Sequence, residues 1–318
     1  MRRPETRPFA EGDLDAAATL LAERHRRHRA AEPLLPARYE DPAAAREEVE
    51  ALWHSQDASG AVALRDDAVV GFLLGVRKSD DAWGPNVWID PAGHAASDAE
   101  DVRDLYGAAS PRWVEEGRTR HYALVPANDE ALVDAWFRLS FGMQHAHGIR
   151  ELPAGSGFPA GTREAHAGDV DALVGLAPLI SDHQSRAPVF GPGPRHPEDE
   201  IRTDIEEDLS AADVGNLVAE LDGRIAGNLV VAPVETSSQH VSLARPEGAS
   251  FLAWAATLPE ARGSGAGVAL TEASFAWVRG QGYETMVTDW RVTNLLSSRF
   301  WPRRGFRTSF LRLYRSIP

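Results

Sequence analysis

Cysteine is absent from the 318 residues of this chain. Its absence excludes disulfide bonds, thiolate metal ligands and cysteine nucleophiles, and it fits a reducing compartment. Lysine is almost absent as well, because Lys78 is the only one. No group of His, Asp and Glu residues has the spacing typical of a metal site, so we expect no metal.

Positive charge is also scarce: 33 Lys and Arg residues face 47 Asp and Glu residues, for a net charge of −14. A protein that neutralises phosphates needs a basic face, so we expect neither nucleic acid nor an anionic membrane as a partner. No apolar run approaches the length that spans a bilayer, and no apolar segment follows Met1-Arg-Arg-Pro. We therefore expect no signal peptide and a cytoplasmic location.

The sequence contains an internal repeat, with each match displaced by the interval from Thr6 to Thr162. The matching pieces are Thr6-Arg7 with Thr162-Arg163, Gly12-Asp13-Leu14-Asp15-Ala16 with Gly168-Asp169-Val170-Asp171-Ala172, and Asp66–Leu74 with Asp222–Val230. The last pair places two turn-forming residues between apolar runs, which predicts strand, tight turn and strand in each half. Matches at one common offset favour a duplication.

The length suggests two domains, and a content of 43% apolar and 25% charged residues predicts a globular chain. Residues 151–161 are rich in proline, glycine and serine, so we place the boundary there. We expect a first domain at 1–152, a linker at 153–161 and a second domain at 162–318. In the first helix, His25 and His28 lie among arginines, which predicts a solvated basic face.

A glycine-rich turn near the C-terminus is the strongest local signal. An apolar strand-like run ends at Leu258, and Arg262-Gly-Ser-Gly265-Ala-Gly267 opens a helix that reaches Val278. Free backbone N–H groups at a helix N-terminus, together with the helix dipole, form an anion site. The equivalent stretch of the first half, residues 92–101, lacks the arginine and the paired glycines. We therefore expect the first half to be a supporting domain.

The turn and the segment after it resemble the GNAT acetyltransferase superfamily. Arg262-x-x-Gly265-x-Gly267 fits the pattern of that family's cofactor loop, and a strand at 285–290, Asn294, Gly305-Phe306 and a terminal strand at 310–314 follow in order. The resemblance implies an α/β (α+β) fold of two tandem GNAT-like domains. Each would have a mixed, mostly antiparallel central sheet flanked by helices.

The resemblance also implies acetyl-CoA as cofactor and direct transfer of its acetyl group to an amine of a small molecule or peptide. The cofactor-binding residues that it implies are Ala255, Ala256, Thr257 and Leu258 for the pantetheine arm, Arg262, Gly263, Ser264, Gly265, Ala266 and Gly267 for the pyrophosphate, and Asn294 and Trp301 where the strands part. Seven arginines and no acid lie between Trp290 and Pro318, and this basic cluster would suit the 3′-phosphate.

Trp301 marks a departure, because many relatives have at this position a tyrosine that protonates the leaving thiolate. A thiolate leaves without much help near neutral pH, so transfer does not require that tyrosine. Glu247 and Asp289 are the candidates for the general base, with His240 as a further one. The proline-bearing loop at 188–197 falls where this fold lines the acceptor side, and Phe190, Arg195 and His196 could contact the acceptor there.

Two alternatives to this interpretation stay open. A non-catalytic acyl-CoA-binding or scaffolding protein would account for the missing tyrosine and the unassigned base. A mycothiol-synthase-like enzyme would share the tandem architecture with an active second half. The oligomeric state expected is a monomer or a homodimer.

Overall fold

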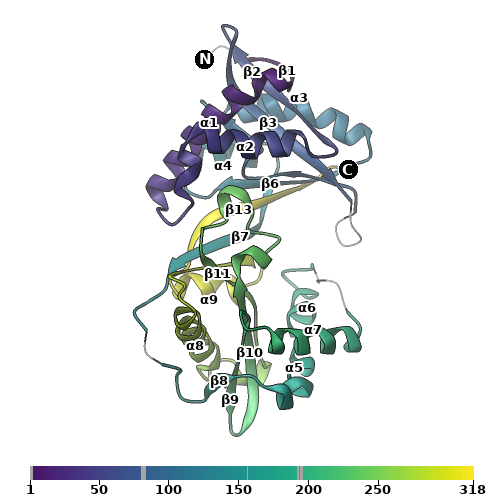
Figure 1. Cartoon of the computed structure of the whole chain (residues 1–318). Coiled ribbons are helices and arrows are strands. Elements are labelled where there is room, and N and C mark those ends of the chain that lie inside the picture. The colour runs from purple at the N-terminus through teal and green to yellow at the C-terminus, as the bar shows by residue number, and fades with distance from the viewer. Residues whose placement is uncertain (1–2, 80–83, 156, 192, 194–195) are drawn as a thin grey trace. The chain divides into compact units, whose positions relative to one another are not determined.

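The structure is a computed structural model, drawn as a ribbon in Figure 1. It describes residues 3–79, 84–155, 157–191, 193 and 196–318. The chain forms two compact units. Unit 1 comprises Met1–His147, Val241–Arg245 and Thr308–Pro318, and unit 2 comprises Gly148–His240 and Pro246–Arg307. Among the described residues, no helix is both long and apolar enough to cross a bilayer.

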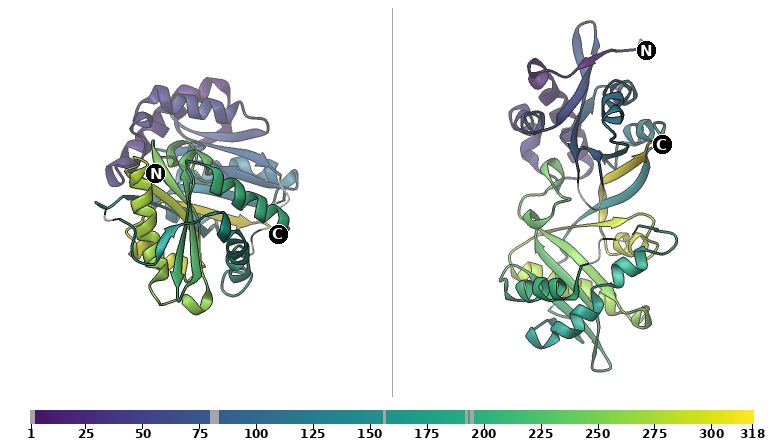
Figure 2. Two further views of the ribbon diagram at one scale, coloured as in Figure 1. Left: turned by 60° about the horizontal axis from the view of Figure 1, so that its bottom comes forward. Right: turned by 90° about the vertical axis from the view of Figure 1, so that its right-hand side faces the viewer.

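Unit 1 is a sheet with helices on both faces (Figures 1 and 2). Its strands lie in the order β1-β2-β3-β4-β6-β13, with β5 also paired to β3, and every neighbouring pair is antiparallel except β4 with β6. The elements are β1 (Glu5–Pro8), α1 (Leu14–Ala31), α2 (Pro42–Trp53), β2 (Ala58–Arg65), β3 (Ala68–Lys78), β4 (Asn86–Ile89), β5 (His94–Ala96), α3 (Asp101–Glu115), β6 (Arg120–Pro126), α4 (Glu130–Phe137), β7 (Gly142–Glu151) and β13 (Arg307–Ser316). Consecutive residues Phe72, Leu73 and Leu74 of β3 are all buried, as expected of a strand covered on both faces.

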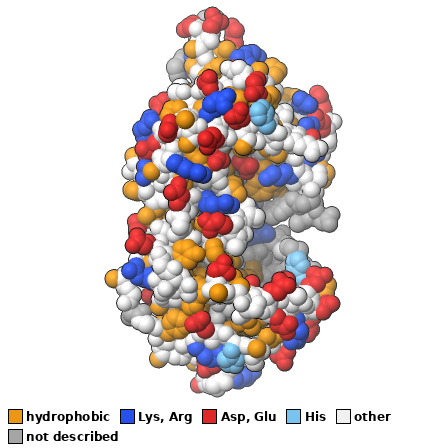
Figure 3. Space-filling view, in the orientation of Figure 1, with side chains coloured by type: hydrophobic (Ala, Val, Ile, Leu, Met, Phe, Trp, Pro, Cys, Tyr) orange, Lys and Arg blue, Asp and Glu red, His pale blue; other side chains and the backbone are white. Residues whose placement is uncertain are grey.

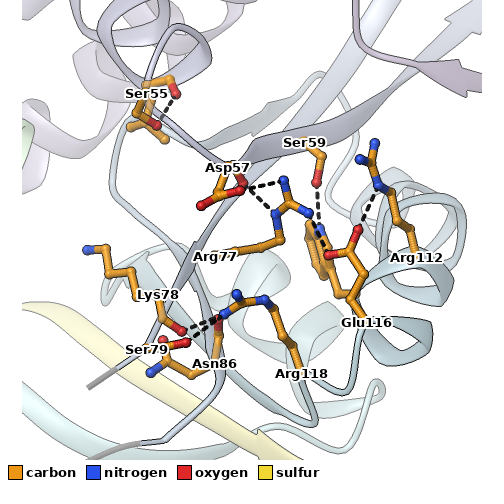
Figure 4. A network of polar contacts seen from close by, with 12 residues as sticks. Ser55, Asp57, Ser59, Arg77, Lys78, Ser79, Asn86, Arg112, Glu116 and Arg118 are labelled. Atoms are coloured by element: carbon orange, nitrogen blue, oxygen red, sulfur yellow. Dashed lines mark hydrogen bonds and ion pairs between the residues drawn. The ribbon is translucent and has the colours of Figure 1, made fainter. Parts of the chain in front are cut away.

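A set of paired charges fastens the end of β3 to α3 (Figure 4). Arg77 donates to Asp57 Oδ1 at 3.0 Å and to Glu116 Oε2 at 2.6 Å. Hydrogen bonding from Arg77 lowers the pKa of the Glu116 carboxyl. Beside this pair, Trp113 of α3 donates from Nε1 to Ser59 Oγ at 2.8 Å. The charged side chains of this set therefore connect β3 with the C-terminal end of α3.

The basic face predicted for α1 is wrong. Arg24, His25 and His28 are all buried, on the same face as the apolar residues of the helix. His25 Nε2 contacts the carbonyl of Pro36 at 2.8 Å, and His28 Nε2 contacts that of Ser309 at 2.9 Å. The helical spacing of buried positions therefore continues through polar residues, which satisfy backbone carbonyls instead of facing water.

Unit 2 has the same kind of architecture. Its strands lie in the order β12-β11-β10-β9-β8, antiparallel except for β11 with β12, and α8 lies on one face with α5 and α7 on the other (Figures 1 and 2). The elements are β8 (Thr162–Glu164), α5 (Val170–Leu176), α6 (Leu179–Gln184), α7 (Glu198–Ser210), β9 (Gly215–Leu221), β10 (Arg224–Pro233), β11 (Ala249–Thr257), α8 (Ala266–Gly280), β12 (Thr285–Arg291) and α9 (Ser297–Arg303). The predicted fold class, a mixed and mostly antiparallel sheet with flanking helices, is confirmed.

The sequence repeat coincides with a repeated local structure. In unit 1, Arg7 forms two hydrogen bonds with the Asp13 carboxylate, at 2.7 and 2.6 Å, and Asp13 also accepts from the backbone at 2.9 Å. In unit 2, Arg163 contacts Asp169 at 2.7 and 3.0 Å, and Asp169 accepts from the backbone at 2.9 Å. The repeated geometry supports the proposal of a duplication.

The two predicted tight turns are present at matching positions. Asp66-Asp67 joins β2 to β3 with φ of 49° and 63°, and Asp222-Gly223 joins β9 to β10 with φ of 52° and 73°. Two successive positive φ values are typical of the two-residue hairpin turn that matches strand twist. The hairpin predictions are therefore confirmed.

We expect Asp169→Ala and Asp13→Ala each to lower the free energy of unfolding by about 1–2 kcal/mol, because each leaves a backbone N–H without its acceptor and removes the carboxylate that accepts two hydrogen bonds from an arginine. The matched controls are Asp171→Ala and Asp15→Ala, two residues further on in each repeat, whose carboxylates are 89% exposed in surface ion pairs. Urea unfolding of the four variants measures this. Equal effects at positions 169 and 171 would contradict the structural role given to the buried Asp169 carboxylate.

The last strand of the chain lies in unit 1. Residues Phe310–Ser316 of β13 pair antiparallel with Pro126–Arg120 of β6, so the C-terminus completes the sheet of the first unit. Ser156, within the expected linker, lies outside the described residues. That residues 153–161 divide two functional domains stays a prediction.

Candidate functional site

The site begins where two parallel strands of unit 2 part. β11 and β12 pair from Ala249 to Phe251 and from Thr285 to Val287, and their ladder then stops while both strands continue. A side-chain contact follows, in which Thr288 Oγ1 donates to the carbonyl of Leu252 at 3.0 Å. Just beyond, the register of β10 with β11 shifts so that Ala253 is an extra residue, which is a bulge. A gap therefore opens between the strand ends.

The glycine turn lies directly after β11. Gly263 and Gly265 have φ of +85° and +96°, and Gly265 is the N-cap residue of α8. A Cβ atom at either position would meet no heavy atom within 4 Å, so their open side is not filled by protein. The N–H of Ala266 contacts Ser264 Oγ at 3.3 Å, whereas Gly267 and Val268 lie in the first helical turn, where no intrahelical acceptor exists. The turn can therefore bind an anion.

A cavity of about 460 Å³ joins the strand gap to this turn. Nine residues of the predicted cofactor set line it: Ala255, Ala256, Thr257, Arg262, Gly263, Gly265, Gly267, Asn294 and Trp301. The other three predicted residues, Leu258, Ser264 and Ala266, lie in the same segment but are not among the lining residues. The remaining wall is mostly apolar and comes from α6, α8 and α9.

Asn294 organises the start of α9 from a buried position. Its Oδ1 atom accepts from the backbone N–H of Leu296 at 3.1 Å and of Ser297 at 3.4 Å. The same oxygen contacts Nε2 of His183, on α6, at 3.1 Å. His183 lines the cavity, and the sequence reasoning missed it, because Asn294 is its partner only through the fold.

The candidates for the general base do not reach this cavity. Glu247 is exposed before the start of β11, and the part of that strand from Ala249 to Ala255, roughly 20 Å of extended chain, lies between it and the cavity. His240 is buried, with Nδ1 2.9 Å from Ser237 Oγ and its ring against Phe251. Asp289 is half-buried on β12, two residues past the end of the ladder, and does not line the cavity either. Their catalytic role stays a prediction.

The loop at 188–197, expected to line the acceptor side, is described in part. Phe190 is 74% exposed, and His196 lies 3.5 Å from Glu200 of α7. Arg195 lies outside the described residues. Acidic side chains gather over α7 on the face shown in Figure 3.

The expected basic cluster is divided. Arg307 forms an ion pair with Glu151, and Arg312 and Arg315 lie on β13 in unit 1. These three arginines therefore do not contribute to a basic cluster beside the glycine turn. Within the described part of unit 2, no ion pair involves Arg262 of the turn, Arg299 and Arg303 of α9, or Arg304 directly after α9. Free cations therefore remain on the elements that line the cavity.

The equivalent strand gap in unit 1 is closed by its own side chains. β4 and β6 pair up to Ile89 and Ala123, and His94 Nε2 then contacts the carbonyl of Leu124 at 2.9 Å. Arg24 donates to the carbonyl of Pro91 at 2.5 Å and also to that of His94. Both side chains are buried, so the space that unit 2 keeps open is filled here.

Among the described residues, one group of possible metal ligands lies within 4.8 Å, namely Glu11, Glu50 and His54 of unit 1. Glu11 Oε2 already accepts from Trp53 at 2.8 Å and contacts His54 at 3.0 Å. Protein hydrogen bonds therefore account for this group.

Comparison with known proteins places this site in a family. Residues 179–306 match the model of the acetyltransferase (GNAT) family. A GCN5-related N-acetyltransferase from Sphaerobacter thermophilus is similar in structure, with a TM-score of 0.58, 14% identity, and coverage of 99% of this chain and 96% of that chain. A GCN5-related glucosamine N-acetyltransferase region of a fungal multi-domain GH3 β-N-acetylglucosaminidase gives 0.56 and 14%, covering 99% of this chain and 38% of that one. These likenesses show the fold. No curated protein matches the sequence.

Proposed function

Residues 179–306 belong to the GNAT acetyltransferase family, and from this premise we propose that unit 2 binds acetyl-CoA and transfers its acetyl group directly to an amine of a small molecule or peptide. One observation carries the proposal. The strand gap, the glycine turn and Asn294 surround a single cavity, although Ala255 and Asn294 are 39 positions apart in the sequence. The family match is to the segment that builds this cavity.

The residues present fit the proposed cofactor. Gly263 and Gly265 leave the turn open on the side where a Cβ would stand, so phosphate oxygens could approach the backbone. The helix dipole and the N–H groups of Gly267 and Val268 would favour their negative charge. Arg262 and the arginines of α9 offer additional cations for a phosphate at the mouth of the cavity.

The chain's own residues would act by positioning. The edge of β11 beyond Leu252 has no ladder partner in β12, so its backbone groups could hydrogen-bond the pantetheine arm and polarise the thioester carbonyl. Apolar residues such as Leu179, Val268 and Phe300 would exclude water from the reacting atoms. Bound acetyl-CoA supplies an activated acyl group, and holding the amine next to it would account for much of the rate.

Unit 1 would then be the supporting partner. Arg24 and His94 occupy the place that corresponds to the open gap of unit 2, and residues 92–101 lack the glycine turn. This supports one cofactor site per chain, in the C-terminal half.

A second candidate is a non-catalytic acyl-CoA-binding protein. It is favoured by Trp301, a buried cavity residue that cannot protonate a thiolate, and by a cavity wall that carries no carboxylate among its described residues. This candidate predicts acetyl-CoA binding without turnover.

Incubation with acetyl-CoA and a panel of amines, followed by detection of free thiol, separates the two candidates. We expect thiol release above the amine-free background with at least one amine, because the cavity has a wall from α6 in addition to the turn and strand proposed to hold the cofactor. Binding of acetyl-CoA without release for any amine would identify the non-catalytic candidate. Absence of both binding and release would overturn the assignment of the cavity.

A further inference from the structure

His183 lies on the cavity wall beside the residue that caps α9. Among the described lining residues, His183 and Arg262 are the two with ionisable side chains. An arginine stays protonated, whereas a neutral imidazole has a nitrogen that can accept a proton, so His183 is the residue of this wall that can act as a base. The proton acceptor that the sequence left unassigned can therefore be sought here.

The hydrogen bonds of Asn294 determine which nitrogen of His183 carries the proton. Oδ1 of Asn294 already accepts from two backbone N–H groups, of Leu296 and Ser297, and an amide nitrogen could not occupy that position. The Nε2 atom of His183, 3.1 Å from the same oxygen, must therefore donate. In the neutral ring, Nδ1 is then left with its lone pair and can accept a proton.

α6, which carries His183, lies on the side of the cavity opposite the phosphate turn. α8, which begins at the glycine turn, lies on one face of the unit 2 sheet, whereas α6 belongs to the helices at the other face (Figures 1 and 2). The cavity between them is lined from both sides. A cofactor with its phosphates at the turn would leave the α6 side for the amine.

We propose that His183 accepts the proton of the attacking amine through Nδ1, with Asn294 holding the ring in the required tautomer. The proposal rests on the proposed acetyl transfer. The amine nitrogen forms a bond to the thioester carbonyl carbon, the carbon–sulfur bond breaks, and the amine proton moves to Nδ1. The thiolate then leaves and takes a proton from solvent.

Other charged residues lie on the elements around the cavity. Asp182 and Arg186 are the charged neighbours of His183 along its own chain segment, Arg262 is on the turn and Arg291 ends β12. Arg299 and Arg303 are on α9, and Arg304 follows it. The neutral form is the one that can accept a proton.

The test is His183→Gln, whose side-chain amide can still donate to Asn294 but cannot act as a base. We expect kcat/KM to fall about 10²–10³-fold and the acidic limb of its pH profile to disappear, while the Kd for acetyl-CoA stays within about 3-fold. The control is His166→Gln, which removes an exposed histidine from the N-cap of the 3-10 turn that precedes α5 and should keep the wild-type profile. The profile is recorded with an aromatic amine, which is neutral at pH 7, so that protonation of the amine does not itself produce an acidic limb.

Asn294→Asp provides a second measurement that does not depend on the first variant. A carboxylate next to Nε2 favours the protonated ring, so the acidic limb should move to higher pH by about one unit. Wild-type-like kcat/KM and an unchanged acidic limb in His183→Gln would overturn the proposal, as would an unshifted limb in an active Asn294→Asp. Absence of thiol release by the wild-type protein with every amine would instead overturn the proposed transfer itself.

Discussion

Gly265→Asp is expected to weaken acetyl-CoA binding by at least 100-fold. Gly265 has φ of +96° at the N-cap of α8, and its missing Cβ faces open space. A carboxylate there would occupy the anion site, accept hydrogen bonds from the free N–H groups of the turn and repel the pyrophosphate. Isothermal titration calorimetry with acetyl-CoA measures the effect.

Gly282→Asp is the matched control for this variant. Gly282 has φ of +89°, and a Cβ at that position would also meet no heavy atom within 4 Å, but it follows the C-terminal end of α8 and is not among the cavity residues. Both substitutions therefore impose a similar backbone cost of about 1 kcal/mol. We expect Gly282→Asp to bind acetyl-CoA like the wild type. Equal losses in both variants would mean that stability, not the anion site, explains the result.

Unit 1 is expected to lose stability steeply between pH 6.5 and pH 4. Burial lowers the pKa of four histidines of this unit: to about 4 for His25, to about 3 for His28, to about 3 for His94 and to about 4 for His121. In the unfolded chain these groups titrate near 6.5. The stabilising contribution of the neutral rings is therefore complete above pH 6.5 and is lost as the pH falls towards the folded values.

The size of this effect follows from proton linkage. Each histidine that is neutral in the folded state and protonated in the unfolded state contributes about 1.4 kcal/mol per pH unit, so four of them give a slope of about 5 kcal/mol per pH unit near pH 5. A fall of one pH unit near pH 5 therefore removes an amount comparable with the lower end of the usual stability of a domain, which is about 5–15 kcal/mol. Urea unfolding followed by tryptophan fluorescence from pH 7.5 to pH 4.5 measures the slope.

Single variants assign the slope to these residues. His94→Gln should lower the slope by the contribution of about one proton, which is about 1.4 kcal/mol per pH unit. His54→Gln removes a histidine whose side chain is 54% exposed and should leave the slope unchanged. A free energy of unfolding that stays constant from pH 7 to pH 5 would contradict the buried, neutral state of these rings.

The glycine turn and Asn294 could be located from the sequence because their chemistry is local. A positive φ before a helix favours glycine, so the spacing of Gly263, Gly265 and Gly267 after an apolar strand already indicated the turn. The hairpins at Asp66 and Asp222 were equally accessible, because two adjacent turn residues separate apolar runs. In these cases the residue types themselves determine the backbone.

Long-range partners were not accessible in this way. The contact of His183 with Asn294 joins residues 111 positions apart, and neither local pattern indicates the other. The burial of Arg24 depends on carbonyl groups near Pro91 and His94 that only the folded loop brings together. Polar residues that satisfy backbone groups inside a unit look in sequence like solvated ones, which explains the wrong prediction for the first helix.

The most direct measurement is a structure of this protein with CoA bound. We predict one CoA per chain, with pyrophosphate oxygens within hydrogen-bond distance of the N–H groups of Gly267 and Val268, and the sulfur in the gap between β11 and β12. The gap between β4 and β6 should stay occupied by His94 and Arg24. CoA bound in unit 1, or bound in unit 2 away from the turn at 262–267, would contradict the account.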